Sequence, residues 1–261
     1  MDKPRVLVGL AVAEDVMEVI TQSCDVVAAF DAQRATQTEL DSAFSEVRGA
    51  LIPSTLPIPN SYFDRYPKLK VLSNVAVGYD NVDIPYATSK GVLVCNTPGV
   101  LDGAVAELVM ALIINLARGI CQSDSYVRSG SWSESHPISL GVDVQGKTLG
   151  IIGLGRIGRT VASTARAFAM RVIYYDTTRS VDLEGAGLAA YRERDEVFRD
   201  SDFVTVHSLL NDSTRHSIGR REFQLMKSRA YFINTSRGAV VRQEDLVEAL
   251  ARNEIAGAGL D

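Results

Sequence analysis

The feature that most constrains the fold is a glycine-rich turn between an apolar run and a helical pattern. Residues 153–158 read Gly-Leu-Gly-Arg-Ile-Gly and directly follow the apolar run Leu149–Ile152. A helical pattern, Val161–Phe168, comes next, and the following apolar run, 171–175, leads to Asp176. A strand–turn–helix–strand unit with G-x-G-x-x-G in its first turn predicts a Rossmann dinucleotide-binding domain.

Each residue type in this turn has a predicted role. Gly153 permits the tight turn out of the strand, and Gly155 lets backbone N–H groups approach a pyrophosphate. Gly158 lets the helix pack closely on the strand. The helix start, which includes Arg156 and Ile157, offers unpaired N–H donors and a positive dipole end to the anion. We therefore assign these five residues to cofactor binding.

Asp176 predicts which dinucleotide binds. A carboxylate at the end of this strand can accept hydrogen bonds from the hydroxyl groups of the adenosine ribose. The same carboxylate repels a 2′-phosphate, so NAD is expected in preference to NADP. Arg179 is the opposing signal, because an arginine near this position can pair with that phosphate.

A second glycine motif does not predict a phosphate-binding site. Residues 141–148 match the phosphate-binding pattern G-x-x-x-x-G-K-[ST]. Such a loop must open a helix so that its N–H groups converge on a phosphate, but here an apolar strand pattern follows. ATP or GTP binding is therefore not expected, and Gly146-Lys147-Thr148 is interpreted as the turn that starts the strand.

The whole chain alternates short apolar runs with helical patterns, which predicts an α/β fold with two doubly wound parallel-sheet domains. The run Asn96–Gly99 breaks the rhythm. We expect a flavodoxin-like domain at 1–98 and the Rossmann domain at 99–261. The expected strands are Val6–Leu10, Val26–Phe30, Ala50–Ile52, Val71–Val75, Val92–Cys95, Thr148–Ile152, Val172–Tyr175, Phe203–His207, Tyr231–Asn234 and Ile255–Leu260, and the expected early helices are Glu14–Gln22 and Thr38–Val47.

A helix is also expected at 102–118, with Asp102 as its N-cap. It is apolar on most of its circumference, so one sheet face cannot account for all of its apolar surface. We expect it to be buried between domains or in a subunit contact.

Composition excludes several classes of partner. A net charge of −5 leaves no chain-wide basic footprint for nucleic acid. The most apolar stretch, Ala104–Ala117, is interrupted by Glu107 and Asn115 and is too short to cross a bilayer. The three cysteines are scattered, which favours free thiols in a reducing compartment, and no residues have metal-ligand spacing. We expect a cytoplasmic protein that binds no metal, membrane or nucleic acid.

Five segments, taken in order, resemble the D-isomer-specific 2-hydroxyacid dehydrogenases, including their glyoxylate/hydroxypyruvate reductase-like and phosphoglycerate dehydrogenase-like members. The resemblance runs from about residue 50 to the end of the sequence. Its segments are Asn74–Asp83, Cys95–Val100 with Ala104–Glu107, Gly146–Gly158, Ile233–Gly238 and Gly257–Asp261.

This resemblance implies hydride transfer between a nicotinamide and C2 of a 2-oxo or D-2-hydroxy acid, in a cleft between two domains. It implies that Arg237 is catalytic and binds the substrate carboxylate and carbonyl. Val77 and Gly78 match backbone donors to that carboxylate, and Asp261 matches a residue that faces the nicotinamide carboxamide. His207, at the end of its strand, is expected to line the cofactor pocket without transferring the proton.

The residues around Arg237 favour the same role independently. Arg237 follows the strand Tyr231–Asn234 at its carboxyl end, where ligands gather in open α/β sheets. Its planar guanidinium can pair bidentately with a carboxylate. Thr235 and Ser236 beside it are polar, and Thr235 is assigned to the cofactor site. The alternative for Arg237 is a surface salt bridge.

The sequence also departs from the family. The family's histidine proton donor and its partner glutamate lie downstream of the Gly-Leu-Asp match, and no residue here matches them or the helix that returns to the first domain. We expect the chain to be part of a longer enzyme. The alternative is a catalytically impaired NAD(H)-binding sensor or interaction protein. Asp102 stands where the family usually has threonine, near the expected pyrophosphate.

The resemblance leaves the substrate weakly constrained, with glyoxylate or hydroxypyruvate as the leading choice. It also shares with the apolar 102–118 helix the implication of a homodimer.

Overall fold

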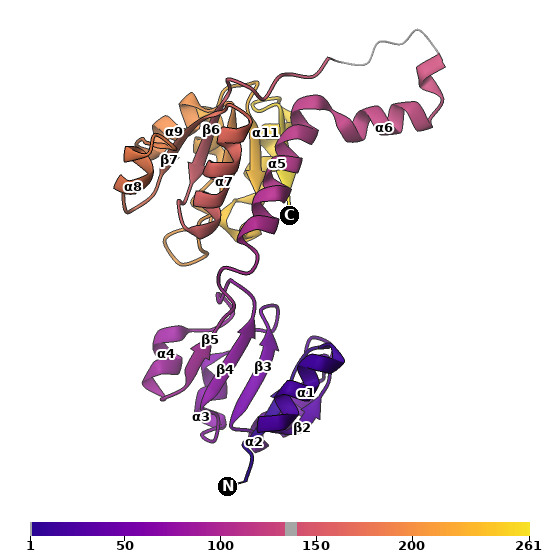
Figure 1. The fold of residues 1–261 in the computed structure, drawn as a ribbon, viewed down its shortest axis with the longest axis vertical. Helices are drawn as coiled ribbons and strands as arrows, with labels where there is room; N and C mark the ends of the chain where they lie inside the picture. The colour runs from indigo at the N-terminus through magenta and orange to yellow at the C-terminus, as the bar shows by residue number, and fades with distance from the viewer. Residues whose placement is uncertain (1, 134–139) are drawn as a thin grey trace. The chain divides into compact units, whose positions relative to one another are not determined.

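The computed structural model describes residues 2–133 and 140–261, and Figure 1 shows their fold. The chain divides into two compact units, Met1–Val100 and Leu101–Asp261. This division lies two residues beyond the boundary predicted between 98 and 99. Each unit is described by itself below.

The first unit contains a five-stranded parallel sheet in the order β2-β1-β3-β4-β5, which is the flavodoxin-like order. All five strands lie within two residues of their predicted bounds. The strands are β1 (Arg5–Val8), β2 (Asp25–Ala29), β3 (Gly49–Pro53), β4 (Val71–Val75) and β5 (Leu93–Cys95), and the helices are α1 (Glu14–Ser23), α2 (Gln37–Glu46), α3 (Asn60–Arg65) and α4 (Ile84–Ser89).

The two faces of this sheet are covered unequally. One face packs against α2, α3 and α4, and its core includes Phe44 and Phe63. Alternate residues of the same strands, such as Val6 and Leu51, face the other side and line a hollow of about 560 Å³ with Ile20 of α1. Because α1 buries none of its own side chains fully, this face is the less protected one.

The second unit contains a six-stranded parallel sheet in the order β11-β10-β9-β6-β7-β8. With β6 counted as strand 1 and the sheet read from β8 to β11, this is the 3-2-1-4-5-6 order of a dinucleotide-binding sheet. The predicted fold class is therefore confirmed. The strands are β6 (Thr148–Ile152), β7 (Arg171–Tyr175), β8 (Ala190–Tyr191), β9 (Phe203–Val206), β10 (Tyr231–Asn234) and β11 (Gly257–Leu260).

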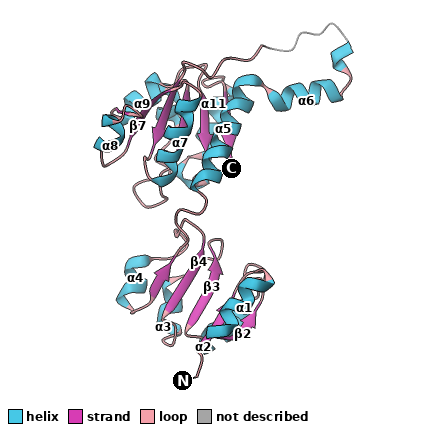
Figure 2. Ribbon diagram, in the orientation of Figure 1, coloured by secondary structure: helices cyan, strands magenta, loops and turns pink. Residues whose placement is uncertain are grey.

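Helices cover both faces of the second sheet, as Figure 2 shows in cyan against magenta strands. On one face α5 (Asp102–Arg118) packs against α7 (Arg156–Ala167). The other face carries α9 (Arg194–Asp200), α10 (Arg220–Leu225) and α11 (Gln243–Ala251). Strand residues alternate between two cores, so that Phe203 packs with the first group of helices and Val204 with the second. The remaining elements are α6 (Ile120–Arg128), α8 (Val181–Gly185) and the short 3₁₀ helices η1 (Ser131–Ser133) and η2 (Gly238–Val240).

The helix at 102–118 has the predicted bounds, but its predicted N-cap is wrong. Leu101 occupies the N-cap position, no side chain caps the helix, and Asp102 is its first residue. One side of α5 is buried, and Leu108 on another side is 37% exposed. Within the described ranges, no single helix combines the length and hydropathy of a membrane span. Helices α5 and α6 reach them only jointly, with a 59° bend between them.

Candidate active site

The residues assigned to the second unit gather at one edge of its sheet. The glycine-rich turn follows β6, Asp176 follows β7, and His207 follows β9. Thr235 and Arg237 follow β10, and Asp261 follows β11. Because all six strands are parallel, these residues share the carboxyl edge. The chain order reverses between β6 and β9, which is the switch point where open α/β sheets bind ligands.

The first and last glycines of the turn occupy positions where the backbone leaves no room for a Cβ. Gly153 has φ +94°, and a Cβ there would lie 2.9 Å from the His207 carbonyl carbon. At Gly158 a Cβ would lie 2.3 Å from the Gly153 carbonyl oxygen, so helix α7 could not pack at its present distance. Helix α7 begins at Arg156, five residues before the predicted pattern, because its first turn is part of the glycine motif.

The middle glycine leaves room for a ligand. Gly155 is the N-cap of α7, and no described atom lies within 4 Å of the position that a Cβ would take. The N–H groups of the first helical turn, at Arg156 and Ile157, have no intrahelical acceptor. An open backbone beside unpaired donors fits the pyrophosphate of a dinucleotide.

Asp176 is fixed to the glycine-rich turn. The Leu154 N–H donates to its Oδ2 at 2.6 Å, and the Thr178 N–H donates to its Oδ1 at 3.2 Å. A carboxylate has about four acceptor positions in all. The Thr177 hydroxyl also donates to Oδ1, at 3.2 Å. The half-buried Asp176 therefore retains capacity to accept about one further hydrogen bond, as from a ribose hydroxyl, while its position relative to the turn is set.

Arg179, the residue that could favour NADP, is engaged elsewhere. Its Nε donates to Glu184 Oε1 at 3.2 Å, and its guanidinium lies 4.9 Å from the ring centroid of Tyr191. Tyr174 also donates to Glu184 Oε1, at 2.8 Å. The hydrogen bond from Arg179 is the main cause that lowers the pKa of Glu184, so the partner carboxylate remains charged.

His207 is neutral near pH 7. Burial lowers the pKa of its imidazole to about 4, and its Nε2 lies 3.0 Å from Thr205 Oγ1. The buried Thr205 belongs to β9, and the His207 backbone N–H donates to the Ile152 carbonyl at 2.8 Å. A neutral imidazole held in this way can form part of a pocket wall, but it has no proton to give as an imidazolium.

Arg237 is presented by a turn that the Asn234 side chain organises. Asn234 Oδ1 accepts from the Ser236 N–H at 3.0 Å and from Ser236 Oγ at 2.8 Å. Asn234 Nδ2 donates to the Arg237 carbonyl at 3.0 Å. Asn234 is only 5% exposed, so this turn is anchored in the core. Sequence reasoning missed Asn234, although an amide at a strand end before polar residues was its signal.

Two buried oxygens near this edge lack hydrogen bonds within the described part of the chain: Thr235 Oγ1 and Asp102 Oδ1. Helix α5 runs antiparallel to β11, because Gly257 approaches Leu116 and Gly259 approaches Leu112. The Asp102 end of α5 is therefore directed toward the carboxyl edge. Unpaired buried polar atoms are costly, which suits a place where a polar ligand binds.

Val77 and Gly78 form a separate group within the first unit. Both are half-buried and follow β4 at the carboxyl edge of that sheet. Asp261 is exposed, and its backbone N–H donates to the Asn234 carbonyl at 3.1 Å. Among the described residues, no three His, Cys, Asp or Glu side chains could hold a metal ion together.

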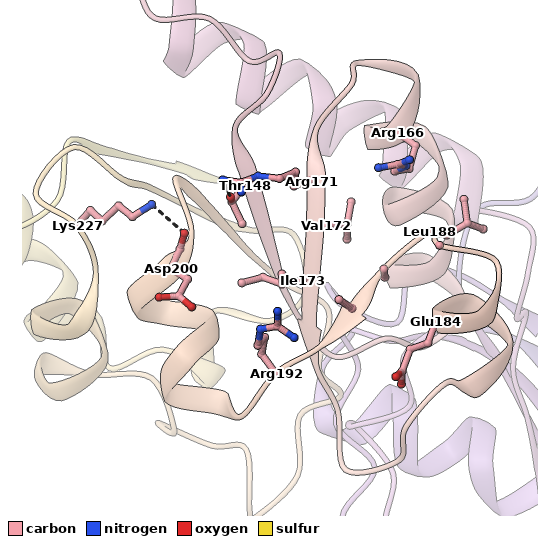
Figure 3. Close-up of a pocket in the computed structure, with 13 residues that line it drawn as sticks. Thr148, Arg166, Arg171, Val172, Ile173, Glu184, Leu188, Arg192, Asp200 and Lys227 are labelled. Carbon is pink, nitrogen blue, oxygen red and sulfur yellow. Dashed lines mark hydrogen bonds between the residues drawn. The ribbon is translucent and has the colours of Figure 1, made fainter.

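The hollow shown in Figure 3, of about 620 Å³, lies at the opposite edge of the second sheet. It is lined by Thr148 and Arg171, the first residues of β6 and β7, and by Arg166 near the end of α7. A ligand there would be remote from the glycine-rich turn. The P-loop-like pattern ends here as well, and β6 follows it directly, so the pattern does not open a helix.

Comparison with known proteins agrees with this arrangement. The family model for "D-isomer specific 2-hydroxyacid dehydrogenase, NAD binding domain" matches residues 110–261. A glyoxylate reductase of Thermococcus litoralis is 40% identical over 264 residues, which span 99% of this chain and 80% of that protein. The chain belongs to the D-isomer-specific 2-hydroxyacid dehydrogenases.

Solved structures of this family agree with both units. A glyoxylate reductase from Paecilomyes thermophila is 30% identical, with a TM-score of 0.89 over 100% of this chain and 82% of that one. An NADPH-dependent glyoxylate/hydroxypyruvate reductase from Sinorhizobium meliloti, in complex with NADP and malonate, is 29% identical, with a TM-score of 0.85 over 99% of this chain and 79% of that one.

As a member of this dehydrogenase family, the chain is an oxidoreductase that acts on small 2-oxo or 2-hydroxy acids. The sensor alternative finds no support, because the relatives that match nearly the whole chain are named as reductases. Family membership does not fix the cofactor, since structures with NAD and with NADPH both occur among the neighbours.

Proposed function

We propose that this dehydrogenase uses NADH to reduce glyoxylate or hydroxypyruvate to the corresponding 2-hydroxy acid. The observation that carries the proposal is the shared carboxyl edge, where the glycine-rich turn, Asp176 and the Asn234-anchored Arg237 come together. The name of the Thermococcus litoralis relative supports the choice of substrate.

Different residues of this edge bind different parts of the dinucleotide. The first turn of α7 binds the pyrophosphate through backbone N–H groups, and Asp176 binds the adenosine ribose. Thr235, His207 and Asp261 would hold the nicotinamide end, where Thr235 Oγ1 would gain the hydrogen bond that it lacks. When bound there, the reduced nicotinamide supplies the hydride.

NAD is favoured over NADP for two reasons. The carboxylate of Asp176 repels a 2′-phosphate, and it cannot turn away without losing its 2.6 Å hydrogen bond from Leu154. Arg179, the nearby cation, is already paired with Glu184 and stacked on Tyr191. Binding a 2′-phosphate would therefore require both residues to change partners.

Arg237 binds the substrate by pairing its guanidinium with the carboxylate and the carbonyl oxygen of the 2-oxo acid. Within the first unit, the backbone N–H groups of Val77 and Gly78 serve as donors to a substrate carboxylate. Reduction adds a hydride at C2 and a proton at the carbonyl oxygen. We do not assign His207 as the proton donor. With a pKa of about 4, its imidazole is neutral near pH 7 and has no imidazolium proton to transfer.

The test separates binding from turnover. Calorimetry measures NADH and NADPH affinity, and loss of NADH absorbance is followed with glyoxylate, hydroxypyruvate, pyruvate and a phosphorylated 2-oxo acid. We expect tighter binding of NADH than of NADPH and the highest kcat/KM with glyoxylate or hydroxypyruvate. Tight NADH binding with no oxidation by any of these acids overturns the reductase proposal, and a preference for the phosphorylated acid overturns the substrate choice.

A further inference from the structure

Three consecutive carbonyl groups after β4 are each held by a hydrogen bond. The Ala76 carbonyl accepts from the Thr97 N–H at 2.9 Å. The Val77 carbonyl accepts from Asn96 Nδ2 at 2.9 Å, and the Gly78 carbonyl accepts from Asn74 Nδ2 at 2.7 Å. Two side-chain amides and one backbone N–H thus fix three successive peptide planes.

Fixing these carbonyls also fixes the N–H groups of the same peptides. The described chain contains no cis peptide bond, so each N–H points opposite to the carbonyl of its own peptide. The N–H groups of Val77, Gly78 and Tyr79 therefore point away from Thr97, Asn96 and Asn74. Within the described residues these three N–H groups have no hydrogen-bond acceptor.

The Asn74 amide is itself held in place. Its side chain is fully buried, and its Nδ2 also lies 3.3 Å from Asn81 Oδ1. Asn81 is fixed in turn, because its Nδ2 donates to the Leu56 carbonyl at 3.0 Å and its carbonyl accepts from the Ile58 N–H at 2.9 Å. The orientation of the loop is thus set from the core of the unit.

We infer that Asn96 and Asn74 are positioning residues that hold three backbone N–H groups, at Val77, Gly78 and Tyr79, as the binding site for the substrate carboxylate. The inference rests on the proposed function, and it adds the Tyr79 N–H as a third donor. Successive backbone N–H groups that are free of acceptors form a favourable anion site, since their partial charges add.

The chemistry predicts what loss of Asn96 does. Without its amide donor, the Val77 carbonyl is free to rotate with its peptide, and the Gly78 N–H rotates away from the carboxylate. Asn96→Asp places an acceptor against that carbonyl, so the peptide is driven out of position. The cofactor residues belong to the other unit, so the affinity for NADH is not affected.

The first experiment is steady-state kinetics of the wild type, Asn96→Ala and Asn96→Asp with NADH and the preferred 2-oxo acid. We expect KM to rise by about 10- to 100-fold, the effect of losing one hydrogen bond to a charged group, and to rise further in Asn96→Asp. Both kcat and the Kd for NADH should stay close to the wild-type values. Asn60→Ala is the matched control, because Asn60 is in the same unit and, among the described residues, its side chain donates only to the exposed Asp83 side chain at 3.1 Å.

A second readout does not depend on turnover. Oxalate is added to the ¹⁵N-labelled protein saturated with NADH, and the amide signals are followed. The largest shifts are expected at Val77, Gly78 and Tyr79, and Asn96→Ala should weaken them. An unchanged KM in both Asn96 variants, or oxalate shifts that miss these amides, overturns the inference even if the enzyme reduces glyoxylate. Conversely, shifts at these amides in a protein that reduces no oxo acid would support the anion site and overturn the proposed function.

Discussion

The backbone N–H of Leu154 donates a 2.6 Å hydrogen bond to Asp176 Oδ2, which joins the glycine-rich turn to the end of β7. Two parts of the candidate cofactor site, one for a diphosphate and one for a ribose, are therefore held together by the protein itself. A site organised before its ligand arrives loses less conformational freedom on binding.

Asp176→Ser should weaken NADH binding and narrow the preference against NADPH. The variant loses both the ribose acceptor and the repulsion of the 2′-phosphate. We expect the NADH Kd to rise by about 10- to 100-fold, while the NADPH Kd changes less. Calorimetry with both dinucleotides measures the ratio. Asp195→Ser, which removes an exposed carboxylate paired with Arg221, is the control, and an unchanged NADH/NADPH ratio in Asp176→Ser would contradict the ribose assignment.

Two alanine substitutions in the same turn should fail in different ways. Gly158→Ala places a Cβ 2.3 Å from the Gly153 carbonyl oxygen and should lower the free energy of unfolding by about 1–3 kcal/mol. Gly155→Ala meets no described atom within 4 Å, so its unfolding temperature should match the wild type while its NADH affinity falls. Thermal unfolding without ligand and NADH titration distinguish the two. Equal destabilisation by both substitutions would refute this division of roles.

The half-buried His207 should make the protein less stable as pH falls. Its folded-state pKa of about 4 lies below the ordinary histidine pKa of 6.5, so between these values the unfolded chain binds a proton that the folded chain does not. Stability therefore decreases from about pH 6.5 downward, by up to about 1.4 kcal/mol per pH unit from this group. Urea unfolding from pH 7 to pH 4.5 measures the slope.

The comparison that isolates His207 is the difference between the wild type and His207→Asn, since carboxylates contribute to acid sensitivity in both. His216→Asn serves as the control, because His216 is exposed. A wild-type slope in His207→Asn would show that the imidazole is not the titrating group.

Arg237→Ala should lower kcat/KM by an amount equivalent to about 2–5 kcal/mol, because a charge-assisted pair with the substrate is lost. Arg237→Lys should recover only part of this loss, since an ammonium cannot pair in the same bidentate geometry. NADH affinity should remain near the wild-type value in both variants. Full activity in Arg237→Ala would leave the surface salt bridge as the better interpretation.

The outer side of α5 should form a homodimer contact. Leu108 is 37% exposed there, in a helix that is otherwise largely apolar. Sedimentation at micromolar concentration should show a dimer for the wild type and a shift toward monomer for Leu108→Glu. The exposed Val247→Glu on α11 is the matched control. A monomeric wild type would contradict the expected contact.

The sequence predicts the sheets well because apolar runs such as Val71–Val75 and Thr148–Ile152 are the strands themselves. It misses β8, because Ala190–Tyr191 is too short to form a pattern and pairs only after β7 is in place. It places Asp102 as an N-cap, whereas Leu101 takes that position and Asp102 is the first helical residue. Local propensity is a weaker constraint than tertiary packing here.

The sequence also predicts some residues of the candidate site and not others. Gly153, Gly158 and Asp176 belong to a motif whose residue spacing predicts a strand–turn–helix structure, so their roles can be predicted from the sequence. Asn74 and Asn96 cannot, because each acts through a hydrogen bond to a backbone carbonyl that only the folded loop brings within reach.

The positions of Arg237, Thr235 and Asp261 just beyond β10 and β11 have a further consequence. The residue pairs between these strands run from Tyr231 with Gly257 to Asn234 with Leu260, and beyond them it is the Asp261 backbone N–H, rather than a side chain, that bonds across to the neighbouring strand. Exchanging them alters what the protein offers to a bound molecule while the pairing of the sheet persists. Proteins that descend from such a scaffold can therefore change their substrate preference by substitutions that leave the fold intact.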